Sequence, residues 1–187
     1  MQIKVRDDKN LKKVSTGVTL PERSRSYSLC VKADALRFAK MYQDAVQTYL
    51  QAIMFDRKEV KAYIGLASAY KYLKEYKKAI NTLLKLIKIN DSNDEYFFEL
   101  GVCYLSDGQP CEAIKYLIKS ILINRENLEA QIQLAIAHEL LEEEDLSLMI
   151  YNKLIETNPD FLKAYYNKAA MLMGMGDYME ASRTFFQ

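Results

Sequence analysis

The sequence predicts an all-α fold in which antiparallel helix hairpins stack side by side into a solenoid. Composition is the first reason, because 187 residues include only 6 Gly and 3 Pro, too few for the turns of a many-stranded fold. An internal repeat of 34 residues is the second, since repeats of about 20–50 residues are typical of solenoids. The third is the helical spacing of apolar residues inside each repeat.

The repeat is visible when residues 63–90 are placed over residues 97–124, which align without a gap. A small residue recurs at one phase, and a large apolar residue follows it four positions later. The small residues are Ala45, Ala79, Ala113, Ser147 and Ala181, and the large ones are Tyr49, Leu83, Leu117, Tyr151 and Phe185. Another small residue lies earlier in each repeat, at Ala33, Ala67, Gly101, Ala135 and Ala169. Five units follow, at 26–59, 60–93, 94–127, 128–161 and 162–187, the last incomplete.

Each unit is predicted to contain two helices joined by a short turn. In the second unit, apolar residues from Tyr63 to Tyr70 share one face of a helix. The pattern breaks near Lys74 and resumes from Ala79 to Ile87. A polar residue ends each complete unit, at Asp56, Asn90, Asn124 and Asn158. One hairpin alone cannot bury its apolar face, so the units are expected to stack on one another.

These residues resemble the tetratricopeptide repeat, a 34-residue unit with an aromatic, a Leu-Gly pair, a Tyr and an Ala at fixed places. The third unit matches most fully, with Phe97, Leu100-Gly101, Tyr104 and Ala113. The resemblance covers residues 26–187 and implies a right-handed superhelix that binds other proteins without catalysis. The first unit departs from the pattern and is interpreted as an N-terminal cap.

The two ends carry separate expectations. Residues 1–25 lie outside the repeat and form a basic arm, with seven basic and three acidic residues. At the other end no capping helix follows the fifth unit, so Leu172, Phe185 and Phe186 are expected to be partly uncovered. Either the chain is cut from a longer repeat protein, or another copy of the chain covers this end.

Composition argues against several classes of function. Lys and Arg number 26 against 25 Asp and Glu, so no basic field exists to hold nucleic acid. No segment is apolar for long enough to enter a membrane. The three cysteines, Cys30, Cys103 and Cys111, form no pair with zinc or disulfide spacing, which favours a reducing, cytoplasmic location.

Catalysis, a metal and a cofactor are not expected either. The single histidine, His138, falls at a helix-packing position, and no phosphate-binding, nucleophile-elbow or zinc-helix motif occurs. The run from Glu142 to Asp145 lacks the spacing of a calcium loop and is interpreted as a solvated turn. The prediction is therefore a non-enzyme.

The resemblance also implies a binding groove, because the first helices of stacked tetratricopeptide units line a concave face that takes extended or helical peptides. The groove positions carried over to this sequence are Ile64, Tyr72, Glu95, Phe98, Glu99, Val102, Leu105, Glu129, Ile132, Ile136, Glu139 and Tyr166. The charged members in the middle of the groove are all acidic. The predicted ligand is a peptide or helix of another protein that combines apolar anchors with Lys or Arg. Alternatively, the apolar members pack between adjacent first helices.

Some members of the family bind the acidic tails of chaperones with a clamp of basic residues. The corresponding positions of this sequence are not basic, which disfavours a chaperone tail as the ligand. Two other functions stay open beside the scaffold: a self-assembling structural module, and the recognition part of a larger enzyme or secretion machine. The basic arm has the chemistry inferred for the ligand, so it is also a candidate to occupy the groove.

Overall fold

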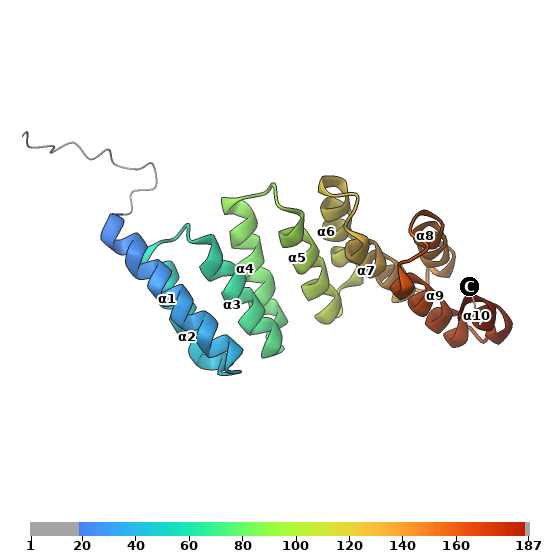
Figure 1. The fold of residues 1–187 in the computed structure, drawn as a ribbon, viewed down its shortest axis with the longest axis horizontal. Coiled ribbons are helices and arrows are strands. Elements are labelled where there is room, and N and C mark those ends of the chain that lie inside the picture. Colours follow the sequence, from blue (N-terminus) through green and yellow to red (C-terminus); the bar gives the residue numbers. More distant parts are fainter. Residues whose placement is uncertain (1–18, 186–187) are drawn as a thin grey trace, which may run out of the picture. The chain divides into compact units, whose positions relative to one another are not determined.

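The computed structural model describes residues 19–185, which contain ten α-helices and no strand (Figure 1). The helices are α1 Leu20–Phe38, α2 Tyr42–Phe55, α3 Val60–Tyr72, α4 Tyr76–Ile89, α5 Asp94–Ser106, α6 Pro110–Ile123, α7 Leu128–Glu139, α8 Glu144–Thr157, α9 Leu162–Gly174 and α10 Tyr178–Phe185. Odd-numbered helices are the first helices of the five predicted units, and even-numbered ones are the second. The all-α solenoid of hairpins is confirmed.

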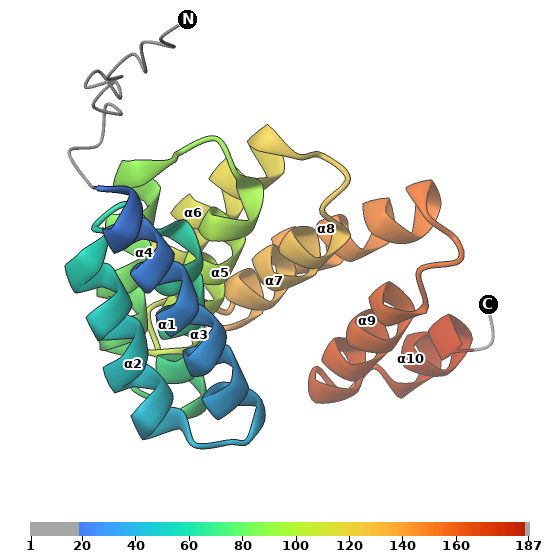
Figure 2. The ribbon, with the colours of Figure 1, turned by 60° about the vertical axis from the view of Figure 1, so that its left-hand side comes forward.

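The chain divides into two compact parts, Met1–Ala69 and Tyr70–Gln187, and α3 runs across the division. In the first part α1 packs against α2. In the second part, α5 pairs with α6, α7 with α8 and α9 with α10, while α4, α6 and α8 each contact the first helix of the next hairpin. The first helices also touch one another, since α5 contacts α7 and α7 contacts α9 (Figure 2). They therefore form a shared face in the second part.

Helix α1 begins earlier than the repeat boundary. It starts at Leu20, so residues 20–25, which were predicted to belong to the arm, are part of the helix. The start is explained by Thr19, whose backbone N–H donates to the Glu22 carboxylate at 2.8 Å, and by Pro21 in the first turn. The hydrogen bonds from Thr19 lower the pKa of Glu22. The rest of the predicted arm, residues 1–18, lies outside the described residues.

The repeated small residues are buried as predicted. Relative exposure is 0–3% at Ala33, Ala67, Ala135, Ala169, Ala45, Ala79, Ala113 and Ala181, and Ser147 and Gly101 are buried too. A Cβ on Gly101 would come within 2.6 Å of Leu117 Cγ, so this crossing of α5 and α6 requires glycine. Similarly, the Tyr49 ring occupies the space that a Cβ on Gly65 would need. Small residues thus let large ones fill the helix crossings.

The large apolar residues that follow them are also buried, with one exception. Tyr49, Leu83, Leu117 and Tyr151 are at most 3% exposed, whereas Phe185 is 52% exposed. No described helix covers Phe185, which accords with the expectation of an uncovered end. The same expectation is wrong for Leu172, which is only 4% exposed, and Phe186 lies outside the described residues.

Three of the four polar residues that end the units make a repeated turn. The side-chain oxygens of Asp56, Asn90 and Asn124 each accept a hydrogen bond from the backbone N–H two residues later, at 2.9, 3.0 and 3.1 Å. All three are the C-cap residues of second helices. Because Asp and Asn close such turns with their own side chains, they recur at the passage from one unit to the next.

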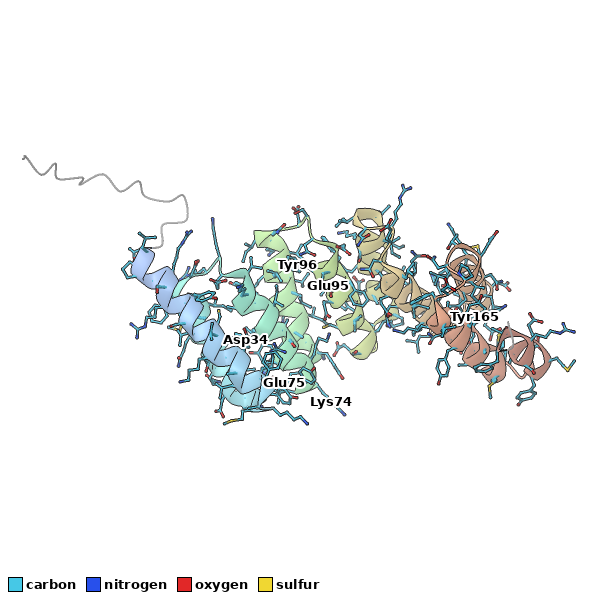
Figure 3. All side chains as sticks on the ribbon, viewed as in Figure 1. Asp34, Lys74, Glu75, Glu95, Tyr96 and Tyr165 are labelled. Carbon is cyan, nitrogen blue, oxygen red and sulfur yellow. The ribbon has the colours of Figure 1, made fainter. Side chains whose placement is uncertain are left out.

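The turn inside each hairpin repeats a backbone conformation. Positive φ occurs at Lys40, Lys74, Gly108, Glu142 and Gly176, with values between 58° and 83°. These residues are 34 positions apart, and Lys74 and Glu75 mark one such turn in Figure 3. A left-handed residue after a helix allows the following N–H groups to satisfy the last carbonyls, and glycine adopts this conformation at least cost.

Gly108→Ala should therefore lower the free energy of unfolding by about 1 kcal/mol, because a Cβ disfavours the left-handed conformation. Urea unfolding followed by circular dichroism measures the change. The matched control is Gly174→Ala, since Gly174 is helical, its φ is not positive, and no atom lies near its missing Cβ. Equal destabilisation by the two substitutions would contradict this explanation of the turn.

Candidate protein-binding surface

The exposed side of the first helices in the second part is the candidate surface and is named the first-helix face. It comprises Lys71, Tyr72, Glu95, Phe98, Glu99, Val102, Leu105, Glu129, Ile136, Glu139, Leu140, Lys163, Tyr166, Asn167 and Met173. Its most exposed large side chains are Tyr72, Leu140 and Tyr166, with relative exposures of 60%, 58% and 63%. They come from the ends of α3 and α7 and from the first half of α9.

Other predicted anchors are half-buried. Phe98 and Leu105 pack against the buried cluster that includes Ala113, Leu117 and Ala130. Val102, from the same helix, and Ile136 are half-buried too, and Ile136 packs against the next cluster along the chain. These side chains support the core and still present some surface. Of the predicted groove residues, Ile64 lies in the first part of the chain, where it is 44% exposed.

Ile132 does not lie on the surface. Its side chain is fully buried in the cluster with Ala135, Tyr151, Leu154 and Ala164. The assignment of Ile132 as a groove residue is therefore corrected: it is a core residue, as in the alternative of packing between helices.

The charges of the first-helix face are not all acidic. Lys71 at the end of α3 makes an ion pair with Glu99 of α5, and Lys163 of α9 makes one with Glu129 of α7. Each pair joins two successive first helices. The expectation of four acidic groups in the middle of the face thus needs correction, because two of the four are neutralised by lysines.

Glu95 keeps an unfavourable charge. It lies on the first turn of α5 beside the buried ring of Tyr96 (Figure 3). Desolvation raises the pKa of its carboxyl, and the carboxylates of Glu99 and Asp94 raise it further, against a smaller opposite effect of Lys71. The ionised form of Glu95 is therefore disfavoured in the folded chain, as expected for a charge whose counterion is not supplied by the fold.

Glu139 ends α7 on the same face. Its Oε1 accepts a hydrogen bond from the Tyr151 hydroxyl at 2.6 Å and one from the Ser147 hydroxyl at 3.3 Å. Burial and the Glu139 carboxylate both raise the pKa of Tyr151, so the phenol stays a neutral donor. In the described part of the chain, Glu139 takes part in no ion pair, unlike Glu99 and Glu129.

A second apolar surface was not anticipated. On the second helices α6 and α8, the exposed large apolar residues are Ile118, Leu122, Ile123, Leu146 and Met149. Two adjoining cavities of about 840 and 680 Å³ lie along α8 and share Lys153 and Thr157 in their linings. A signal existed in the sequence, because the other units have Asp, Lys or Glu at the place of Leu146.

His138 is mostly covered, and its Nδ1 lies 2.6 Å from Glu143 Oε2. Among residues 19–185, no group of three or more His, Cys, Asp or Glu side chains could hold a metal ion. None of the helices in that range is long and apolar enough to cross a membrane.

Sequence comparison identifies the family. A tetratricopeptide repeat model matches residues 60–93 and 94–127, which coincide with the second and third predicted units, and another matches residues 150–181. Together the matches span more than half of the sequence. The chain belongs to the tetratricopeptide repeat family. Proteins of this family bind other proteins and generally act as non-enzymatic scaffolds. Comparison with curated protein sequences gives no match.

Solved structures of tetratricopeptide repeat proteins resemble this chain. MamA is 24% identical with a TM-score of 0.72, and the match covers 82% of this chain and 90% of MamA. A repeat protein from Parabacteroides merdae is 24% identical with a TM-score of 0.78, over 85% of this chain and 62% of that one. YrrB is 22% identical with a TM-score of 0.67, and the match covers 83% of this chain and 80% of YrrB. At these identities the likeness concerns the fold.

Glu95→Gln is expected to raise the stability of the tetratricopeptide domain at pH 7. A carboxyl whose pKa is raised by folding destabilises the folded state above that pKa, and the effect disappears as the pH falls and the carboxyl binds a proton. The difference in urea midpoint between the two proteins should thus shrink from pH 7 to pH 4. Glu126→Gln, which removes an exposed charge from the α6–α7 loop, controls for charge loss alone. A pH-independent difference for Glu95→Gln would contradict the account.

Thiol labelling tests the burial of the cysteines. Burial raises the pKa of Cys30 and of Cys103 to about 12, and Cys111 is exposed. Because thiolates are the reactive form, one cysteine should react rapidly with a thiol reagent in the native protein, and three should react in urea. Mass spectrometry of the labelled peptides identifies the site, and Cys111→Ser should abolish the rapid phase. Rapid labelling of Cys30 or Cys103 would contradict the burial of these two side chains.

Proposed function

We propose that this chain is a non-enzymatic scaffold that binds an apolar, basic segment of another protein on the first-helix face. The observation that carries the proposal is the combination of Tyr72, Leu140 and Tyr166, all more than half exposed, with carboxylates whose charge the fold does not balance. Aromatic and apolar side chains supply contact energy, and the unbalanced carboxylates favour a partner with Lys or Arg.

The family supports a binding role, and the description of one similar structure names a class of ligand. YrrB is described as a tetratricopeptide repeat protein with an unusual peptide-binding site, so peptides are ligands for at least one protein of this fold. The free thiols of this chain suit a reducing compartment such as the cytoplasm. A non-enzymatic role agrees with the general role of the family.

Affinity capture from a lysate tests the location. The bait is the full chain, and the test variant carries Tyr72→Ser, Leu140→Ser and Tyr166→Ser, three exposed positions where substitution leaves the core intact. Since aromatic and apolar anchors carry much of the energy at protein interfaces, recovery of specific partners should fall by about fivefold or more. Circular dichroism confirms that the variant is folded.

The matched control carries Leu122→Ser and Met149→Ser on the second helices, with exposures of 70% and 60% before substitution. It should recover the same partners as the unsubstituted bait. Loss of partners with the control variant, and not with the first-helix variant, would move the binding surface to α6 and α8 and overturn the proposal.

A second candidate is self-association through the uncovered end. Phe185 is 52% exposed, whereas its four counterparts in the other units are at most 3% exposed. Its ring lies edge-on to the ring of Tyr166, with 6.4 Å between the ring centroids. With Leu162 and Tyr165 it lines a cavity of about 270 Å³. Light scattering at increasing concentration distinguishes the candidates, because a constant monomer mass excludes self-association.

A further inference from the structure

A pocket of about 340 Å³ opens among α7, α8 and α9, at one end of the first-helix face. Its polar lining consists of Glu139, Glu144 and Asn167, and its apolar lining includes Met171 and Met175. The volume is about ten times the volume of a water molecule in the liquid, enough for the end of a long side chain. Flexible thioethers adapt to the shape of what they contact.

Two hydroxyl groups hold the Glu139 carboxylate by hydrogen bonds. Tyr151, which is fully buried, donates to Oε1, and so does Ser147. Both bonds use the same oxygen, so Oε2 remains available to the pocket. Glu144 is exposed, and in the described part of the chain it makes no hydrogen bond or ion pair through its side chain. Two carboxylates therefore reach the pocket without a cation.

The first unit shows a related arrangement that is complete. Tyr49 occupies the place of Tyr151 three repeats earlier, and its hydroxyl donates to Asp34 at 2.5 Å. There Arg37 joins the carboxylate and the phenol, with its Nη2 3.5 Å from Asp34 and its Nε 3.3 Å from the Tyr49 oxygen. In the fourth unit, Glu139 occupies the place of Arg37. A buried tyrosine thus donates to a carboxylate in both units, but in the fourth unit that carboxylate stands at the place of the guanidinium, and Ile136 stands at the place of Asp34.

We infer that the pocket receives the guanidinium of an arginine from the protein bound on the first-helix face, an inference that rests on the proposed function. The planar fork of arginine can donate to Glu139 Oε2 and to Glu144 together. Its aliphatic stem then lies against Met171 and Met175. A neutral side chain leaves both carboxylates unbalanced, so the pocket selects for positive charge.

Methionine methyl NMR of the full chain tests the inference without a known partner. The protein is labelled with ¹³C at the methionine methyl groups and titrated with N-acetyl-arginine methylamide, and in parallel with the neutral citrulline analogue. Saturable shifts are expected for Met171 and Met175 with the arginine probe alone. Met54, which is exposed on α2, serves as the internal control and should not shift.

Glu139→Gln should weaken the arginine probe about tenfold, because a charge-assisted hydrogen bond becomes a neutral one. Gln still accepts from Tyr151, so the fold is retained. Glu142→Gln is the matched control, since it removes an equal charge from the adjacent turn and does not line the pocket. The absence of shifts at Met171 and Met175, equal shifts with citrulline, or equal affinity in Glu139→Gln would each overturn the inference.

Failure of the arginine-pocket inference can be distinguished from failure of the proposed scaffold function. If captured partners depend on Tyr72, Leu140 and Tyr166 while the arginine probe leaves Met171 and Met175 unmoved, the scaffold function stands and only the arginine pocket is wrong. If the probe binds and no partner depends on the first-helix face, the pocket exists and the proposed location of the partner is wrong.

Discussion

Close helix crossing is the constraint on which the rest of the structure depends. Where α5 crosses α6, Gly101 meets Leu117 so closely that a Cβ would clash. The same alternation of small and large residues recurs every 34 residues, and the small residues are buried in all five units. Because the buried positions are fixed in this way, the side chains on the opposite side of each first helix are free to differ without altering the fold.

One series of equivalent positions shows how far this freedom goes. Arg37, Lys71, Leu105, Glu139 and Met173 occupy one place in five units. In the first unit the side chain is a cation beside a buried tyrosine, and in the fourth it is an anion held by another. In the second unit Lys71 reaches the next first helix to pair with Glu99. The fold therefore displays varied chemistry from a uniform scaffold, which is the property that suits a tetratricopeptide repeat to protein recognition.

Most of the fold could be predicted from the sequence, because the helix crossings impose a residue size at fixed intervals. The start of α1 could also have been predicted, since Thr19, Pro21 and Glu22 form a helix-start pattern. Ile132 could not be placed by phase alone, because the residues at the same phase differ in burial: Ile64 and Tyr166 are exposed, and Phe98 is half-buried. The two Lys–Glu ion pairs could not be predicted either. Their partners are 28 and 34 residues apart in sequence, and whether the charged groups meet depends on how successive first helices pack.

Covalent side-chain footprinting of the chain, with and without a captured partner, tests the central claim most directly, because it compares the two apolar surfaces in one experiment. The partner is predicted to protect Tyr72, Leu140 and Tyr166 on the first helices and to leave Leu122 and Met149 as reactive as before. Protection of Leu122 and Met149, with the first-helix residues unchanged, would contradict this prediction.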